Sequence, residues 1–426
     1  MPTSQITQNT SNRNFALHPE DPEFFQVHRE VGFPEWSRGH WIGHTLSGRT
    51  PPPDAIQMHT NDYLCLAADP RIIEAEIEAL RQFGHGQSVS RIFLHRQESP
   101  LQTFEQRIAQ FMAAEDAVLC MSGYSANSGL IQAIAPKGTP VYLDMRAHAS
   151  LWEGVPSSGA VAVPFRHNDP AHLERQVGTR GPGIIVVDAL YSTTGNICPL
   201  ADVVSVAERT GCILVVDETH SFGTLGPNGE GLAVSLGLAD RIHFRTVGMS
   251  KAVASRGGVV LGSARNMEFF RYEAMPMIFS TTVLPHEVAG YDAALDIIET
   301  EKWRRERLHA NHRVLTGALD EMGYNVSDSK AQIIGLEAGT EADVIRLREA
   351  LETRGVFGAV FCAPATPKKR AMVRFTVNCG LSDADLERVI QVCRDIRDEV
   401  GMWDWAATRR KAASKMQAST PRHAAE

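Results

Sequence analysis

Residues 212–220 read Cys-Ile-Leu-Val-Val-Asp-Glu-Thr-His, and this stretch decides the fold class of the chain. An apolar run from Ile213 to Val216 ends abruptly at Asp217, and His220 follows three positions later. Such a continuous run, with no alternation of apolar and polar residues, is typical of a strand buried on both faces of a mainly parallel sheet. Ligands of these sheets bind beyond the carboxyl ends of the strands, so we expect Asp217 and His220 to face a ligand.

A lysine downstream indicates which ligand this is. Residues 246–251 read Thr-Val-Gly-Met-Ser-Lys, and the small residues around Lys251 favour a desolvated amine that can attack an aldehyde. A lysine after an Asp-x-x-His pair suits pyridoxal phosphate. Lys251 would form a Schiff base, Asp217 would keep the ring nitrogen protonated, and His220 would reach the phenolic oxygen of the ring. The sequence therefore predicts a pyridoxal phosphate enzyme, although a surface position is the ordinary alternative for any single lysine.

The composition is that of a globular protein with two or more domains. The chain has 426 residues, of which 43% are hydrophobic and 22% charged. Its net charge of -8 argues against nucleic acid as a main partner. The seven cysteines form no Cys-x-x-Cys pair, which is typical of reduced thiols. The N-terminus has no apolar signal core, and no run approaches the roughly 18 apolar residues of a membrane span, so we expect a cytoplasmic protein.

The chain divides into four parts by composition and pattern. Residues 1–57, which are polar and rich in proline, form an N-terminal arm, and residues 58–294 form a large domain that binds the cofactor. Residues 295–407 form a smaller α+β domain, and residues 408–426 form a basic tail that we expect to be disordered. The fold class is α/β, with a mainly parallel sheet in the large domain.

Short apolar runs separated by helical stretches predict the strands of the large domain. We expect these strands at residues 117–121, 141–143, 184–187, 213–216 and 259–261. In the smaller domain the pattern predicts helices over 295–322 and 341–354, and strands at 333–336, 356–362 and 372–377. A capping-box-like start at Ser382 predicts one further helix.

Several other residues stand where a ligand could contact them. Residues 123–127 follow a strand and open a helix, whose N–H groups make a phosphate cradle, although a glycine before a helix is common. Thr246 and Ser250 could bond the phosphate, and one of them could instead cap a turn. Asp144 and Asp188 also end strands, but for both a cap or turn is favoured.

Arg374 lies inside an apolar strand and needs an anion there. A substrate α-carboxylate and an internal acid fit this need equally well. His148 is a lone histidine, and such residues are more often structural than catalytic. His40 and His44 have neither a glutamate between them nor a Cys/His ladder nearby, so we expect surface or interface histidines and no metal.

Together these segments resemble the α-oxoamine synthases, fold-type I pyridoxal phosphate enzymes that join an amino acid to an acyl-CoA. Residues 61–67, Asn-Asp-Tyr-Leu-Cys-Leu-Ala, look like the N-terminal signature of that family. Residues 122–127, the segment around His148, the Asp-x-x-His pair and Lys251 follow in family order. The resemblance covers roughly residues 55–400, and it implies a fold-type I transferase with a seven-stranded type of sheet in the large domain.

One subgroup is more similar still. Typical family members carry a Gly-rich Gly-Ser-Arg stretch where residues 87–94 read Gln-Ser-Val-Ser-Arg-Ile-Phe-Leu, and this departure leaves open which residues line the acyl pocket. Other segments look like the bacterial synthases of α-hydroxyketone autoinducers, which make quorum-sensing signals. They are residues 148–154, 183–187, 191–193, 332–337 and 355–366.

The resemblance implies roles for the matching residues. Lys251 would be the Schiff-base lysine and later the acid and base at Cα, and His148 would stack on the ring. Asp217 would pair with the ring nitrogen and His220 with the ring oxygen. The substrate carboxylate would be held by Arg374 and Asn61. The other cofactor contacts would come from Ser122, Gly123, Tyr124, Ser192, Thr246 and Ser250, and from Thr281 and Thr282 of a second subunit, so a homodimer is expected.

The resemblance also implies an activity. An acyl-CoA, with a medium-chain group favoured, would condense with a small α-amino acid such as 2-aminobutyrate or S-adenosylmethionine. Loss of carbon dioxide would then give an aminoketone precursor of an α-hydroxyketone signal. The rivals are a housekeeping enzyme of the 8-amino-7-oxononanoate synthase or glycine C-acetyltransferase type, a pyridoxal phosphate-binding regulator without turnover, and an aminotransferase. The departure at residues 87–94 argues against the first rival, and the complete set of Lys251, Asp217 and His148 argues against the second.

Overall fold

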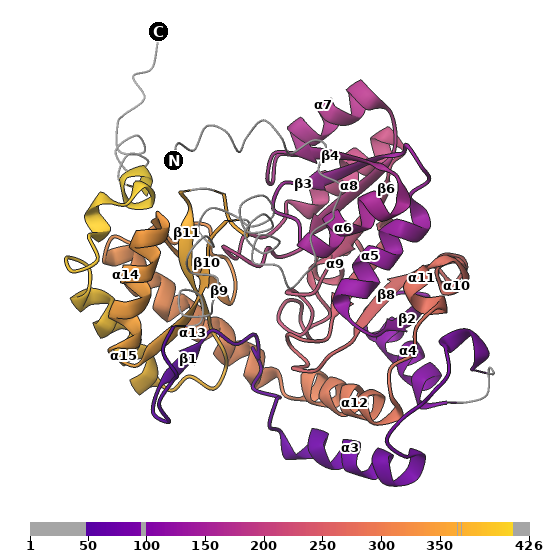
Figure 1. The fold of residues 1–426 in the computed structure, drawn as a ribbon, viewed down its shortest axis with the longest axis horizontal. Helices are drawn as coiled ribbons and strands as arrows, with labels where there is room; N and C mark the ends of the chain where they lie inside the picture. The colour runs from indigo at the N-terminus through magenta and orange to yellow at the C-terminus, as the bar shows by residue number, and fades with distance from the viewer. Residues whose placement is uncertain (1–47, 95–98, 364, 368, 412–426) are drawn as a thin grey trace, which may run out of the picture.

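The computed structural model of the chain describes residues 48–94, 99–363, 365–367 and 369–411. Within these ranges two sheets form the centres of two domains (Figure 1). Most of the expected N-terminal arm, including His40 and His44, lies outside the described residues. None of the described helices is both long enough and apolar enough to cross a membrane.

The large sheet has the strand order β2-β8-β7-β6-β5-β3-β4. Its strands are β2 (Asp116–Cys120), β3 (Pro140–Asp144), β4 (Val161–Phe165), β5 (Ile184–Asp188), β6 (Ile213–Asp217), β7 (Phe244–Gly248) and β8 (Gly258–Gly262). Strand β8 runs antiparallel to both of its neighbours and the other pairings are parallel, which confirms the expected mainly parallel sheet. The sequence pattern does not reveal β4 and β7, because Pro164 and Arg245 interrupt their apolar runs.

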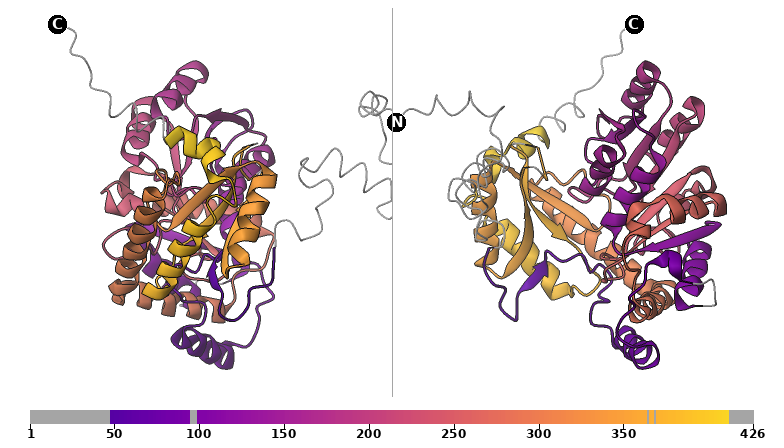
Figure 2. Two further views of the ribbon diagram at one scale, coloured as in Figure 1. Left: turned by 90° about the vertical axis from the view of Figure 1, so that its left-hand side faces the viewer. Right: turned by 45° about the vertical axis from the view of Figure 1, so that its right-hand side comes forward.

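Both faces of this sheet are buried, as the continuous apolar runs predict. Ile184 and Val186 of β5 belong to one apolar cluster, and Ile185 and Val187 belong to another. Each face is covered by helices, as Figure 2 shows from two sides. The first face packs on α5 (Gly123–Ile134), α6 (Ala149–Ser158), α10 (Ala264–Glu273) and α11 (Met275–Ile278), and the second on α7 (Pro170–Arg180), α8 (Leu200–Thr210) and α9 (Leu232–Ser235).

The smaller domain is built on a sheet with the order β1-β10-β11-β9. Its elements are β1 (Ile56–Met58), β9 (Ile333–Gly339), β10 (Val356–Phe361), β11 (Ala371–Thr376), α14 (Glu341–Glu352) and α15 (Asp383–Asp395). Strand β1 pairs in parallel with β10, so it spans the boundary expected at residues 57 and 58 and joins this second sheet. The capping box expected at Ser382 is present, with Asp385 as its partner.

The helix expected over residues 295–322 is wrong as a single element. It is two helices, α12 (Pro285–Thr300) and α13 (Lys302–Glu321). Glu301 interrupts them with φ -101° and ψ 65°, and its carboxylate receives Arg71 and Arg304. Neither proline nor glycine marks this break, so helical periodicity alone runs through it. The remaining elements are α3 (Pro70–Phe83), α4 (Pro100–Phe111), η2 (Arg91–Phe93), η3 (Ala239–Arg241) and η4 (Met402–Asp404).

The start of the expected disordered tail is also corrected. Residues 406–411 are helical. Arg410 pairs with Glu337 at 2.6 Å and Lys411 with Asp320 at 2.8 Å, so residues 408–411 are anchored to the smaller domain. Residues 412–426 lie outside the described residues.

The carboxyl ends of the parallel strands meet at one edge of the large sheet, and the smaller domain lies against the loops that leave this edge. Asp188 is paired in register with Asp217, and Asp217 with Thr246. From the smaller domain, Gln332 donates to the carbonyl of His220 at 2.7 Å. The predicted ligand-binding edge therefore faces the smaller domain.

Candidate active site

Asp217 ends β6 and is buried with both carboxylate oxygens occupied. The backbone N–H of Thr219 donates to Oδ1 at 2.8 Å, and Nδ2 of Asn127 donates to Oδ2 at 2.7 Å. Burial and the charge of Asp217 raise the pKa of the neighbouring Asp188 well above its usual range. The raised pKa favours the protonated form of Asp188, which lies beside Asp217 at the ends of neighbouring strands.

Asp144, the third acid at this edge, has a structural role. It is fully buried, and although burial raises its pKa, hydrogen bonds from His167 and from the backbone N–H groups of Arg146 and Asn168 lower it overall. The distances from Asp144 oxygens to these donors are 2.8 to 2.9 Å. The turn role favoured for Asp144 agrees with these contacts.

Lys251 lies in the turn after β7 and is partly buried. Burial lowers the pKa of its amine, the positive charge of Arg374 lowers it further, and Asp217 acts in the opposite direction. A lower pKa increases the fraction of unprotonated amine near neutral pH, and the unprotonated amine is the nucleophilic form. The small residues around Lys251 thus produce the desolvated amine that the sequence predicts.

His148 is the N-cap of α6, and its side chain is held at one nitrogen. Nδ1 lies 2.7 Å from Oγ of Ser150 and accepts the Ser150 backbone N–H at 3.3 Å. The backbone N–H of His148 donates to Asp188 Oδ1 at 3.2 Å. The rings of His148 and Tyr124 meet edge to face, with 6.4 Å between centroids. These contacts hold the His148 ring beside the start of α5.

The start of α5 has the form of an anion cradle. Ser122 is its N-cap and exchanges hydrogen bonds with Ser125, which donates its N–H to Ser122 Oγ at 3.0 Å. A Cβ atom on Gly123 would lie 2.8 Å from the Cα atom of Gly248, so glycine is needed for α5 to approach β7 this closely. Helix N-termini with this geometry suit a phosphate group.

His220 is buried, and both its ring and its backbone carbonyl have hydrogen-bond partners. Its Nδ1 lies 2.6 Å from the phenolic oxygen of Tyr63, and its carbonyl oxygen accepts Nε2 of Gln332. Burial, reinforced by the charges of Lys251 and Arg374, lowers the pKa of His220 well below its usual value. The imidazole is therefore neutral, and it can offer one N–H to a ligand.

Arg374 is a buried cation whose hydrogen bonds within the described part of the chain go to neutral oxygens. Nη1 donates to the Ser192 carbonyl at 2.9 Å and Nη2 to Asn61 Oδ1 at 3.0 Å. Its Nε is buried without a hydrogen-bond partner among the described residues. The guanidinium lies 4.5 Å from the centroid of the Phe361 ring. These contacts include no acidic side chain of the protein. They therefore favour a substrate carboxylate over an internal acid as the anion that Arg374 binds.

The residues expected near the phosphate occupy different environments. Thr246 is buried, and its hydroxyl donates to Asn127 Oδ1 at 2.6 Å. Ser250 and Thr281 are exposed. Thr282 is buried, and its hydroxyl has no hydrogen-bond partner within the described part of the chain. Thr246 is thus committed to the Asn127 contact, whereas the hydroxyls of Ser250 and Thr282 are available to a ligand.

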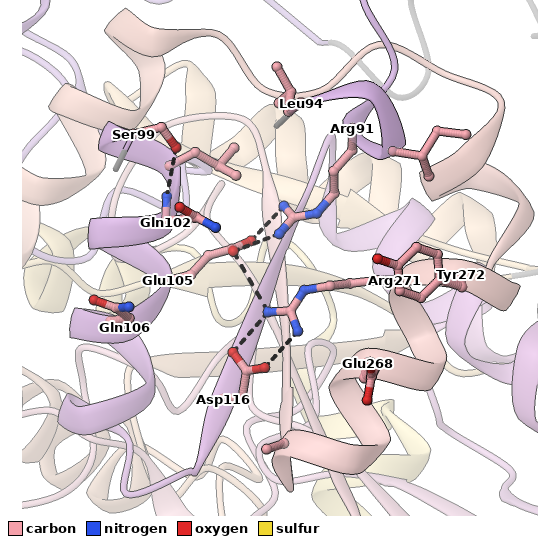
Figure 3. A pocket seen from close by; sticks show the side chains of 13 residues that line it. Arg91, Leu94, Ser99, Gln102, Glu105, Gln106, Asp116, Glu268, Arg271 and Tyr272 are labelled. Carbon is pink, nitrogen blue, oxygen red and sulfur yellow. Dashed lines mark hydrogen bonds and ion pairs between the residues drawn. The ribbon is translucent and has the colours of Figure 1, made fainter. Parts of the chain in front are cut away.

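Residues 87–94, where the chain departs from the family pattern, contribute to a separate pocket of about 350 Å³ (Figure 3). In this pocket Arg91 of η2 pairs with the buried Glu105 at 2.6 Å, and Arg271 pairs with Asp116 at 2.6 Å. The hydroxyl of Ser90 donates to the carbonyl of residue 278 at 2.6 Å, and the backbone of Ser90 bridges to that of Thr281. The segment thereby positions the Thr281–Thr282 turn.

The structure adds four residues to the expected site: Tyr63, Asn127, Ser150 and Gln332. Each is buried, and each contacts one of the expected catalytic side chains or its backbone. Tyr63 and Asn127 lie inside segments that the sequence resemblance covers, but residue type alone gave them no role. Ser150 and Gln332 also lie inside such segments, and like Tyr63 and Asn127 they meet distant partners only in the folded chain.

Comparison with known proteins places this geometry in a family. The family described as aminotransferase class I and II matches residues 53–392. A CAI-1 autoinducer synthase from Vibrio campbellii is 40% identical over 352 residues, which is 83% of this chain and 89% of that protein. An 8-amino-7-oxononanoate synthase from Symbiobacterium thermophilum is 33% identical and covers 82% of this chain and 90% of its own length.

Solved structures give the same result. A serine palmitoyltransferase from S. paucimobilis, solved with a bound pyridoxal phosphate adduct, superposes with a TM-score of 0.78 at 31% identity over 82% of this chain and 88% of that chain. The serine palmitoyltransferase of Sphingomonas wittichii gives a TM-score of 0.80 at 26% identity over 89% and 98% of the two chains. The chain therefore belongs to the aminotransferase class I and II family, with the fold-type I architecture and the α-oxoamine synthase relatives that its motifs indicate.

Proposed function

We propose that this chain is a pyridoxal phosphate-dependent C-acyltransferase that joins an acyl-CoA to a small α-amino acid and releases carbon dioxide. The product would be an aminoketone precursor of an α-hydroxyketone autoinducer. The observation that carries this proposal is the buried Arg374 guanidinium, which has no acidic partner among the described residues and acts electrostatically on Lys251. A carboxylate-binding group next to a nucleophilic amine suits an amino acid substrate.

The residues present fit pyridoxal phosphate. Asp217 would supply the carboxylate for a ring nitrogen, and the first turn of α5, which Gly123 lets approach Gly248 closely, would supply a phosphate cradle. The buried Thr282 hydroxyl lacks a hydrogen-bond partner among the described residues. When bound, this cofactor supplies an aldehyde that amines can attack and a ring that accepts the electron pair released at the amino acid Cα.

The protein side chains then control the position and the protons of the substrate. Arg374 and Asn61 would hold the α-carboxylate until it leaves as carbon dioxide. This contact would orient the substrate and so determine which Cα bond faces the ring. Lys251, whose pKa is lowered by burial, would remove the Cα proton and return one to the product. His148 would lie against the cofactor ring, and His220 would donate its N–H to the ring oxygen.

The choice of product rests on the relatives. The CAI-1 autoinducer synthase is 40% identical to this chain, whereas the 8-amino-7-oxononanoate synthase is 33% identical, so autoinducer synthesis is the better-supported function. The expected substrates are 2-aminobutyrate or S-adenosylmethionine with a medium-chain acyl-CoA. A homodimer and a cytoplasmic location complete the proposal.

The test combines purified protein, pyridoxal phosphate, each candidate amino acid and acyl-CoAs of graded length. Release of CoA thiol and the mass of the product are followed together. CoA release that peaks at a medium or long chain, with a decarboxylated ketone product, would support the proposal. Release only with short or dicarboxylic thioesters and glycine or alanine would assign the chain to the housekeeping enzymes. No release with any thioester would favour a regulator without turnover.

A further inference from the structure

A chain of three hydrogen bonds links Asp217 to His148. Nδ2 of Asn127 lies 2.7 Å from Asp217 Oδ2 and 2.9 Å from Ser150 Oγ, and Ser150 Oγ lies 2.7 Å from His148 Nδ1. The amide oxygen of Asn127 accepts the hydroxyl of Thr246, with 2.6 Å between Oγ1 and Oδ1. Asn127 is 2% exposed and Ser150 is fully buried, so their polar groups are shielded from water and bond to one another. The exposed His148 ring is the one end of this network that reaches the open site.

The direction of every bond follows from one starting point. The NH₂ group of Asn127 donates to Asp217 Oδ2, because a carboxylate oxygen accepts. Its carbonyl oxygen then faces Thr246, whose hydroxyl must donate. The second N–H of Asn127 donates to Ser150, which leaves the Ser150 hydroxyl proton free to donate to His148. Ser150 Oγ can therefore donate its proton to Nδ1 of His148.

A separate contact supports this direction. The backbone N–H of Ser150, which can only donate, also points at Nδ1 of His148 at 3.3 Å. A proton on Nδ1 would face this N–H and would disrupt both contacts. Two donors of independent origin, one from the backbone and one from the side-chain network, thus converge on the same nitrogen of His148.

We propose that Asn127 is a positioning residue that links the Asp217 carboxylate through Ser150 to His148 and fixes the imidazole as its Nε2–H tautomer. This inference rests on the proposed function only in that both Asp217 and His148 would contact the cofactor. The single N–H of His148 is then kept at Nε2, the nitrogen without a hydrogen-bond partner among the described residues. The ring can rest on the cofactor and donate to a substrate oxygen without changing tautomer.

The experiment determines the His148 tautomer in the holoenzyme. Protein labelled with ¹⁵N in histidine and loaded with pyridoxal phosphate is examined by long-range proton–nitrogen correlation, in which protonated and unprotonated ring nitrogens differ widely in shift. The His148→Gln variant assigns the signal. Asn127→Ala and Ser150→Ala remove successive members of the network, and Ser128→Ala is the matched control, because its hydroxyl donates to the Tyr124 carbonyl outside the network.

Wild type and Ser128→Ala should show His148 protonated at Nε2 alone. Both network variants keep the backbone N–H of residue 150, so the two nitrogen shifts should move only part of the way toward averaged values. The double variant should move them no further than either single variant. The cofactor affinity should fall about tenfold or more in Asn127→Ala, which loses a hydrogen bond to the Asp217 charge, and should change less than about twofold in Ser150→Ala.

A wild-type proton on Nδ1, or His148 nitrogen shifts in Ser150→Ala that equal those of the wild type, would overturn the inference. The Ser150→Ala result decides the matter even where Asn127→Ala fails to fold or to bind the cofactor. No acyl-CoA enters these measurements, so their outcome is independent of whether the chain transfers acyl groups. Failure of the proposed acyl transfer would leave the tautomer result intact, and the converse also holds.

Discussion

The phenolic oxygen of Tyr63 lies 2.6 Å from Nδ1 of His220, and both side chains are buried. Burial raises the pKa of Tyr63, so its phenol keeps its proton and can donate to the imidazole. The contact joins the segment at residues 61–67 to the Asp-x-x-His pair, which lies more than a hundred positions later in the chain. Two motifs that the sequence shows separately are thus joined by one hydrogen bond.

Replacing Tyr63 by Phe should remove this donor and leave the ring packed in place. Because His220 Nδ1 would lose its partner while remaining buried, we expect a loss of about 1–3 kcal/mol in the free energy of unfolding. Urea denaturation of the two proteins measures this difference. An unchanged unfolding free energy would show that water or another group satisfies His220.

Arg374→Gln should have two separable effects. Loss of the guanidinium should raise the KM for the amino acid at least about tenfold, because the carboxylate loses its charged partner. Removal of the positive charge that disfavours the Lys251 ammonium should also raise the pKa of Lys251. The rate at which the apoprotein develops its visible absorbance with pyridoxal phosphate should therefore reach its plateau at a higher pH.

Arg374→Lys is the matched control for this experiment. It keeps the charge but loses the planar fork. The pH dependence of cofactor capture should stay close to that of the wild type, whereas the KM for the amino acid should still rise. If both variants shift the pH dependence equally, a change in burial rather than the Arg374 charge controls the Lys251 amine.

Asp188 should make the protein less stable as the pH rises. Its pKa is raised in the folded state by burial and by Asp217, so the folded protein holds a proton that the unfolded chain releases above about pH 4. The stabilising contribution of Asp188 is fully present below its unfolded pKa and is lost as the pH rises toward its folded pKa.

Asp188→Asn tests this expectation, because it carries no titrating proton and keeps an oxygen for the His148 N–H. As the pH rises from 5 to 7, the unfolding free energy of the variant minus that of the wild type should increase by up to about 1.4 kcal/mol per pH unit. Parallel curves would mean that Asp188 is ionised when folded.

The Arg91–Glu105 pair should contribute to stability far more than a surface pair. Glu105 is 3% exposed and also accepts the backbone N–H of Leu119 at 2.6 Å, so Arg91→Met would leave a buried carboxylate short of one partner. We expect a loss of about 3 kcal/mol in the free energy of unfolding. Arg209→Met, which breaks the exposed pair with Glu174, should cost less than about 1 kcal/mol. Equal effects in chemical denaturation would contradict this ranking.

The sequence is most informative where a residue that can take part in the reaction also lies in a recognisable local sequence pattern. Asp217 ends an apolar run, and Lys251 stands among small residues, so the sheet, the site edge and the cofactor follow from short segments. Contacts between distant segments do not follow in this way. Asn127 acts through residues on two other elements, and Gln332 reaches His220 from the other domain. The break at Glu301 is likewise set by the tertiary partner Arg71 and by Arg304, one turn further along the chain.

The most direct test of the central claim follows the carbon that leaves. Amino acid labelled at its carboxyl carbon is incubated with the holoenzyme and a medium-chain acyl-CoA, and labelled carbon dioxide and free CoA are measured in the same samples. The account predicts equal amounts of the two products, and loss of both in Lys251→Ala. CoA release without carbon dioxide, or consumption of the amino acid that needs a 2-oxo acid instead of a thioester, would contradict it.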